Sequence, residues 1–596
     1  MRPLRALPIA ALLAVSLLGG CRQPASPTTA AEAPTPQAAS QSDVASAWPD
    51  AVQAFIDGYF EHFPTFAASA GKHAYDGKLP DYSPAGLKAT ASWLHAQHDA
   101  ISAFGDDRLD GALRFQRDYV LAVIAGQLFN LEESGFPYNN PGFYAGDLSP
   151  SMYLTRPYAP LAERMAAFVS YQEALPAAIA QIKANLKTPL PASYVELGVN
   201  TFGGYSSFFA SDVPAIFATV EDADLQARFK SANEAAIKAT RDMADWFTAQ
   251  RAGATEDFAL GAEKFSRMLL ASEGVDMPLD QLKAIGEADL SRNLAALRAA
   301  CHEFAPGETL HACVLKVEAN KPEGGAVEGA RRQLVGLREF VVAKDLVTIP
   351  GTEAALVEEA PPFNRWNFAY IEIPGPYEKN LPSVYYIAPP DPSWPQAEQD
   401  AYVPGRADLL FTSAHEVWPG HFLQFLHANR ADWIFGRLFV GYSYAEGWAH
   451  YTEEMMFDAG VEGGGAEVHI GQLGNALLRN VRFLSAIGMH TGNMTMQESE
   501  QMFREQAFQD PGNARQQAAR GTYDPGYLNY TLGKLMIMQL RDDWMASHAG
   551  PDALRQFHDA FLGYGGPPVP LVRAQMLGGK AETRLWQGPA LGPPAN

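Results

Sequence analysis

Residues 415–421 read His-Glu-Val-Trp-Pro-Gly-His, and this stretch decides how the fold can build a functional site. A hydrolytic zinc site needs three protein ligands, an open position for water, and a carboxylate that takes a proton from that water. The usual arrangement places two His at i and i+4 of one helix, with Glu beside the first. Here His421 stands six residues after His415, and Glu416 takes the place of the general base.

The six-residue spacing excludes a straight helix as the scaffold for both His. Six helical residues rotate by about 600° and rise by about 9 Å, so the two imidazoles would point apart. Pro419 lies four residues after His415, where its ring clashes with the His415 carbonyl and its missing N–H removes a hydrogen bond. Gly420 permits unusual backbone dihedrals. We therefore predict a kink at 418–420 that returns His421 towards His415.

A third ligand is expected on the helix that follows, where residues 444–454 read Tyr-Ala-Glu-Gly-Trp-Ala-His-Tyr-Thr-Glu-Glu. Glu446, His450 and Glu453 fall on one helical face, 25 or more residues after His421. We assign Glu446 as the metal ligand, with His450 as a rival. Glu453 or His450 is expected to orient a ligand imidazole by a hydrogen bond. The alternative is a set of polar helix-surface residues around a Pro-Gly turn.

These motifs resemble a bacterial family named domain of unknown function 885. That family shows His-Glu-x-x-Pro-Gly-His-x-x-Gln followed by Glu-Gly-Trp-Ala-x-Tyr-x-Glu, and Gln424 and Tyr451 extend the match. The resemblance covers most of the mature chain, through Pro64, Gly71, His73 and Asp76, through Gly261, Glu263 and Phe265, and through 524–534. The family is in turn similar to helical, cleft-type zinc peptidases, which have two helical halves around a channel. The resemblance implies a two-lobed, clamshell fold and peptidase or carboxypeptidase chemistry, with a late Tyr or His that stabilises the oxyanion.

The predicted function is a zinc-dependent hydrolase that cleaves peptides, with one Zn²⁺ per chain and Glu416 as general base. Tyr530 is the first candidate for stabilising the charge on the carbonyl oxygen and Tyr527 the second, against packing roles for both. Arg482 and His490 are candidate substrate-binding residues. Arg482 suits a substrate carboxylate, but a structural ion pair is its alternative reading, and Lys534 is a weaker candidate.

Two other functions stay open at this stage. An esterase or a non-peptide amidase would use the same metal and the same residues. An inactive, envelope-anchored binding protein would keep the fold, although a binding protein has no need of a general base beside its ligands.

Composition bounds the class of protein. The chain has 596 residues, of which 47% are hydrophobic and 19% are charged, which suits a large folded core. A formal net charge of -22 argues against a nucleic-acid partner. Helical periodicity predicts a mainly α fold as one catalytic unit over 47–596, with a small sheet at 347–395 beside the zinc-site helices at 406–460. The oligomeric state is left open.

The N-terminus predicts a lipid anchor. Residues 1–20 combine basic and apolar segments that end at Leu-Gly-Gly before Cys21, as in a bacterial lipoprotein signal, with an ordinary cleaved signal as the alternative. Residues 21–46 are rich in Pro, Ala, Ser and Thr and predict a disordered tether. Since Arg22 follows the Cys, resemblance to lipoproteins of two-membrane bacteria favours the outer membrane, facing the periplasm.

Two further cysteines, Cys301 and Cys313, enclose a short segment with a Pro-Gly turn. In an oxidising compartment they are expected to form a disulfide that contributes about 3 kcal/mol, with two free thiols as the alternative.

Overall fold

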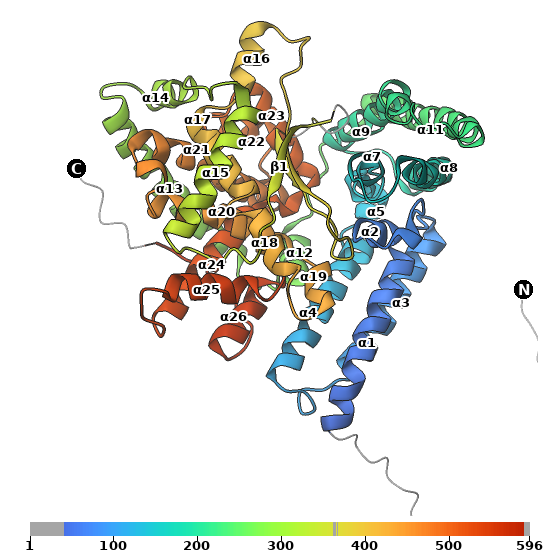
Figure 1. The fold of residues 1–596 in the computed structure, drawn as a ribbon, viewed down its shortest axis with the longest axis horizontal. Helices are drawn as coiled ribbons and strands as arrows, with labels where there is room; N and C mark the ends of the chain where they lie inside the picture. The colour runs from blue at the N-terminus through green and yellow to red at the C-terminus, as the bar shows by residue number, and fades with distance from the viewer. Residues whose placement is uncertain (1–40, 362–364, 366–367, 589–596) are drawn as a thin grey trace, which may run out of the picture.

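The predicted helical periodicity is realised in the computed structural model of the chain, which describes residues 41–361, 365 and 368–588 (Figure 1). The first half contains α1 (Gln41–His62), α2 (Pro64–Ser69), α3 (Pro84–Ser102), α4 (Gly111–Leu128), α5 (Phe136–Asn139), α6 (Gly142–Ala145), α7 (Ser151–Thr155), α8 (Leu161–Asn185), α9 (Ala192–Ser211), α10 (Val213–Ile216), α11 (Ala223–Gln250) and α12 (Ala262–Glu273).

The second half contains α13 (Leu279–Phe304), α14 (Leu310–Glu318), α15 (Gly325–Ala343), α16 (Gln396–Tyr402), α17 (Arg406–Glu416), α18 (His421–Ala428), α19 (Ile434–Leu438), α20 (Tyr442–Asp458), α21 (Ala466–Thr491), α22 (Met496–Gln506), α23 (Pro511–Tyr523), α24 (Asn529–Met545), α25 (Ala553–Leu562) and α26 (Val569–Leu577). The predicted mainly helical fold is thereby confirmed.

Local sequence signals set several helix starts. The side chains of Ser83, Asp110 and Asp222 accept hydrogen bonds from backbone N–H groups in the first turns of α3, α4 and α11. Thr495 and Glu498 form a reciprocal capping box at the start of α22. Each cap satisfies donors that a helix end would otherwise leave unpaired, so these boundaries follow directly from the sequence.

The helices form two lobes with separate cores. One core gathers buried side chains between Ala68 and Phe247, where α8, α9 and α11 pack together on one side of the molecule (Figure 1). A larger core draws mainly on the chain after Phe258 and includes the pairs α13–α21 and α20–α24. A third cluster joins α1, α3 and α4 to Phe435 and Phe439 of the second lobe.

A cavity of about 2040 Å³ lies between the lobes. Its walls include residues of α4, α9 and α12 from the first half and of α18, α20, α23 and α24 from the second. Its volume exceeds the roughly 300–1,000 Å³ of typical small-molecule pockets, which suits an extended substrate.

The sheet has three strands in the order β1-β3-β2. β3 (Ser383–Ile387) is central, with β1 (Ala355–Glu359) parallel to it and β2 (Ala369–Glu372) antiparallel. All three strands lie within the predicted sheet region, 347–395, although the two glutamates of Ala-Leu-Val-Glu-Glu weaken the strand pattern of β1. The buried Tyr385 and Ile387 of β3 belong to the same core as Ala414 of α17.

Of the predictions for the N-terminus, only the one for the end of the tether can be compared with the structure. The signal peptide, Cys21 and most of the tether lie outside the described residues. However, α1 begins at Gln41, so the last residues of the predicted tether are helical; no Pro or Gly interrupts the chain between Gln41 and Trp48.

Cys301 and Cys313 form a disulfide that joins the end of α13 to α14. In the described part of the chain, no helix has the combined length and apolar character needed to cross a bilayer.

Candidate metal centre

The helix breaks between the two His of the 415–421 stretch, as its spacing requires. α17 ends at Glu416 and α18 begins at His421. At the break the Gly420 N–H donates to the Ala414 carbonyl at 2.9 Å, and a Cβ on Gly420 would lie 1.8 Å from the His415 carbonyl oxygen. Only glycine fits this close approach. Trp448 of α20 fixes the break from outside, because its Nε1 donates to the Pro419 carbonyl at 2.9 Å.

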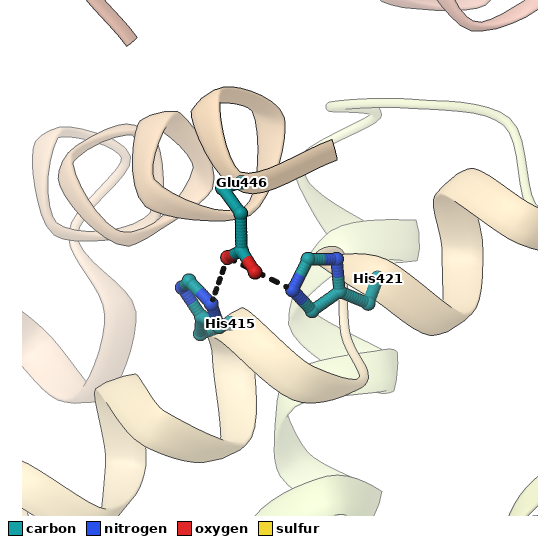
Figure 2. Close-up of side chains that lie close together, drawn as sticks. All are labelled: His415, His421 and Glu446. Atoms are coloured by element: carbon teal, nitrogen blue, oxygen red, sulfur yellow. Dashed lines mark hydrogen bonds and ion pairs between the residues drawn. The ribbon is translucent and has the colours of Figure 1, made fainter. Parts of the chain in front are cut away.

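The break brings three candidate ligands together (Figure 2). His415 Nε2 lies 3.2 Å and His421 Nε2 3.3 Å from the same oxygen, Oε2 of Glu446. One ligand atom from each residue lies within 4.8 Å of the others. Two imidazole nitrogens and one carboxylate are a donor set that zinc accepts, with a fourth position left for water. The residues present therefore fit the expected metal.

A close contact between α20 and α24 sets the position of Glu446 relative to Tyr530. A Cβ on Gly447 would lie 2.4 Å from the Cα of Gly533, so the backbones of α20 and α24 touch. This contact also places Tyr530 of α24 beside the site, with its ring 6.2 Å from the His415 ring between centroids. The distance between Glu446 and Tyr530 therefore depends on the close approach of the two helices at Gly447 and Gly533.

Behind His415 lies a buried polar support. His415 Nδ1 is 2.7 Å from Glu453 Oε1, while Glu453 Oε2 is 3.1 Å from His450 Nδ1. Arg479 of α21 also contacts Glu453 Oε1, at 3.2 Å. In this arrangement Glu453 orients the imidazole of His415, as metal-binding His generally require. His450 faces Glu453 with its Nδ1 atom, which supports Glu446 over His450 as the ligand.

The electrostatics fit this division of roles. Burial opposes charge on His415, but the hydrogen bonds that its imidazole donates to the carboxylates of Glu446 and Glu453 raise its pKa to about 9. Burial raises the pKa of Glu446, but His421 and His415 outweigh it and hold that pKa well below the usual range. Burial lowers the pKa of His450 to about 4, so this imidazole is neutral at pH 7. Metal binding to His415 would require its neutral imidazole, so binding is linked to loss of a proton.

Glu416 has the environment of a proton acceptor and donor. Burial raises its pKa above the usual value, and Glu446 adds to this effect, while His415 and His421 oppose it. A raised pKa brings a carboxylate closer to working pH, which favours proton transfer in both directions. On the sheet side lies Tyr385 of β3, a fully buried phenol whose pKa is raised by burial and by the charge of Glu416.

The structure separates the two candidate tyrosines. Tyr530 is 8% exposed and faces the centre. Burial and the charge of Glu446 raise its pKa, so its hydroxyl stays protonated and able to donate. Tyr527 is fully buried, and its hydroxyl donates to Ser485 at 3.0 Å. This position explains Tyr527 by packing, since its donor is already used within the core.

The three remaining candidate residues differ in whether the structure explains them by packing. His490 is buried with its Nε2 2.8 Å from the Gly521 carbonyl and its Nδ1 accepting from the Leu260 N–H, which is a structural arrangement. Lys534 is fully buried and pairs with Glu454 at 2.7 Å. Arg482 instead lies beside Tyr530, with its guanidinium carbon 4.8 Å from the ring centre.

Arg479, Trp448 and Tyr385 contribute to the site but were not among the residues predicted for it. Arg479 precedes Arg482 by about one helical turn and lies on a similar helical face, so the reasoning that named Arg482 could also have named it. Trp448 lies inside the 444–454 motif, where its indole N–H had no assigned partner. No local pattern distinguishes Tyr385, because only the folded sheet brings it near Glu416.

Fold and site together define a class: large helical proteins in which a broken helix and a returning helix assemble a His-His-Glu set. The family described as "Bacterial protein of unknown function (DUF885)" matches residues 64–576. The chain belongs to this family, as the motifs around 415–454 suggested.

Solved structures show the same fold. One, described as a "putative lipoprotein of unknown function" from Shewanella oneidensis, shares 24% identity at a TM-score of 0.73 and covers 91% of this chain and 100% of its own. A second, described as a "putative lipoprotein" from Colwellia psychrerythraea, shares 16% identity at a TM-score of 0.74 and covers 90% of this chain and 99% of its own. A "putative oligoendopeptidase F" from Bacillus anthracis reaches a TM-score of 0.26 at 10% identity. No curated protein matches the chain.

Proposed function

We propose that the protein is a zinc-dependent hydrolase that cleaves peptides. The observation that carries the proposal is the convergence of His415, His421 and Glu446 within 4.8 Å, with Glu416 directly beside the first ligand. A zinc ion held by these three residues would activate a water molecule and polarise the carbonyl that the water attacks. Phe425, Tyr442 and Asn529 line the cavity between the lobes. Each lies within four residues of a ligand or of Tyr530 in the sequence, which supports the approach of an extended peptide to this region from the cavity.

Three side chains supply the remaining chemistry. Glu416 accepts the proton of the attacking water on its carboxylate and transfers it to the nitrogen of the leaving amine. Tyr530 donates its hydroxyl hydrogen to the carbonyl oxygen as negative charge develops there. Glu453 holds the His415 ring in one orientation throughout.

Metal analysis and a peptide library test the proposal together. Zinc-loaded protein is expected to contain about one zinc per chain and to cleave members of a mixed peptide library, read by mass spectrometry. The Glu416→Gln variant is expected to keep its zinc and to lose at least about 10³-fold in turnover. Glu398→Gln, at an exposed position on α16, is the matched control.

The outcomes separate the alternatives. Equal turnover by Glu416→Gln and the unsubstituted protein contradicts the role of Glu416. Cleavage of esters or small amides without any peptide identifies an esterase or amidase with the same centre. Zinc binding without turnover of any substrate class favours a binding protein.

We also propose a bacterial envelope location through a lipid on Cys21. Two observations support it: the signal-like sequence before Cys21, and the description of both similar structures as lipoproteins. Membrane fractions of a Gram-negative host should contain the unsubstituted chain, and Cys21→Ser should move it to the soluble envelope fraction. An unchanged distribution contradicts the anchor.

A further inference from the structure

Three arginines lie around Tyr530, and one of them lacks an acidic partner. Arg479 pairs with Glu453 at 3.2 Å, and Arg520 pairs with Asp524 at 2.9 Å. Arg482 donates its Nε to the neutral Gln517 at 2.8 Å and lies over the Tyr530 ring. Within the described residues, no carboxylate forms an ion pair with Arg482.

The burial of Arg482 makes this lack of a partner costly. The residue is only 8% exposed, and a guanidinium cannot shed its proton in a protein. Burial, followed by the charges of Arg520 and Arg479, lowers its pKa. A buried charge normally has a partner, because desolvation costs several kcal/mol. Elsewhere in the same lobe, Arg292 and Lys534 follow this rule, since both contact Glu454.

The position of Arg482 relates it to the metal centre. The Tyr530 ring lies 6.2 Å from the ring of His415 and 4.8 Å from the Arg482 guanidinium, which bounds their separation at about 11 Å. A hydrogen bond to a ligand takes up about 3 Å of that span. An extended peptide covers at most about 3.3–3.6 Å per residue. The remaining distance therefore leaves room for at most about two residues of substrate.

We propose that Arg482 binds the terminal carboxylate of a peptide substrate, so that the enzyme removes one or two residues from the C-terminal end. Arginine suits this role because its planar fork can hold both carboxylate oxygens at once. The bound carboxylate provides the charge that the protein itself does not supply. This inference rests on the proposed peptidase function and narrows its substrate to chains with a free C-terminus.

Binding tests the inference without relying on turnover. The probes are N-acetyl-Ala-Ala and its C-terminal amide, titrated calorimetrically into the full chain with and without zinc. The unsubstituted protein is expected to bind the free acid at least 10-fold more tightly than the amide. Arg482→Gln should lose this preference, and Arg482→Lys should retain part of it. Arg504→Gln, exposed on α22, is the matched control and should behave as the unsubstituted protein.

Equal affinity for acid and amide in the unsubstituted protein overturns the inference. A preference that survives in a folded Arg482→Gln variant, as judged by circular dichroism and thermal melting, overturns it as well. If both Arg482 variants unfold, the acid-to-amide ratio of the unsubstituted protein still decides the outcome.

Turnover supplies a second readout. With free-acid and amidated forms of one peptide, Arg482→Gln should raise KM for the acid and leave the amide nearly unchanged. An equal fall in kcat for both forms would instead show that Arg482 only positions Tyr530, against the inference. Failure of the proposed function looks different: no peptide is cleaved, whether or not the acid binds preferentially. Cleavage of amidated peptides at internal bonds keeps the hydrolase and removes the carboxylate site.

Discussion

Two neighbouring residues of α20, Glu453 and Glu454, face two different buried charge clusters. On the Glu454 side, Lys534 contacts Glu454 at 2.7 Å, and Arg292 contacts both Glu454 at 2.9 Å and Asp289 at 2.8 Å. We call these four residues the closed cluster. Two carboxylates there meet two cations, and each charge has a partner.

The cluster on the Glu453 side is incomplete. Glu416, Glu446 and Glu453 lie there against one guanidinium, that of Arg479, which contacts Glu453. Glu446 contacts the imidazoles of His415 and His421, which would have to be neutral to bind a metal, so its negative charge would then be left to the metal. The comparison teaches that a buried cluster whose charges are all paired has a structural role. A buried cluster that lacks positive charge instead indicates a cation that completes it.

Removal of a metal ligand is expected to have the largest effect. His421→Ala leaves two ligands, so zinc content should fall well below one per chain and turnover by at least about 10³-fold. Metal analysis and peptide cleavage measure both. His98→Ala, exposed on α3, is the control. Retention of zinc by His421→Ala would contradict the comparison, because the zinc would then be bound by residues outside this cluster.

Breaking the closed cluster should affect stability and leave the metal in place. Lys534→Met removes one cation and leaves Glu454 and Asp289 short of one positive charge, so the free energy of unfolding should fall by about 3–5 kcal/mol. Denaturant melts measure this loss, with exposed Lys238→Met as control. Zinc content of the folded protein should stay at one per chain. A loss of zinc without a loss of stability contradicts the division between the clusters.

Glu273 shows what happens to a buried acid with neither a metal nor a cation. It accepts hydrogen bonds from Ser443 at the start of α20 and from Asn529 at the start of α24, and burial raises its pKa to about 7. A raised folded-state pKa means that its contribution is present below pH about 4.5 and is lost as pH rises through 7.

The test is the pH dependence of unfolding in Glu273→Gln. Between pH 4.5 and 7, the unsubstituted protein should lose about 3 kcal/mol relative to this variant. Chemical denaturation at several pH values gives both curves. Parallel curves would show that the Glu273 carboxyl titrates normally, so that it would not illustrate the effect of burial without a cation or a metal.

The smallest expected effect concerns Glu453 itself. Glu453→Gln keeps the shape of the side chain but removes its charge, so zinc affinity should fall by about 10–100-fold while the fold persists. Competition with a zinc chelator measures the change. An unchanged affinity would mean that Arg479 and His450, rather than Glu453, set the orientation of His415.

The site was predictable from the sequence where covalent spacing constrains it. Pro419 and Gly420 forced the break between the His, and the face shared by Glu446 and Glu453 followed from helical periodicity. The mainly helical character of the chain followed from the same periodicity. The predicted structural alternative for Tyr527 fits its buried position.

Other features depend on contacts between distant segments, which no local pattern records. α9 was missed because its Gly, Ser and Phe residues give a weak helical pattern, although packing against α11 stabilises it. Strand β1 is defined by its parallel pairing with β3. The pairing of Lys534 with Glu454, and the absence of such a pair at Arg482, appear only when α20, α21 and α24 meet.

The glycine contact between α20 and α24 has a mechanical consequence. Backbone touches backbone at Gly447 and Gly533, so at this crossing point no side chain separates the two helices. Glu446 and Tyr530 therefore travel as parts of one rigid body, and neither can approach the substrate without the other. His421 begins a separate short helix after the break at 417–420, so its distance from Glu446 and Tyr530 depends on the geometry of that break.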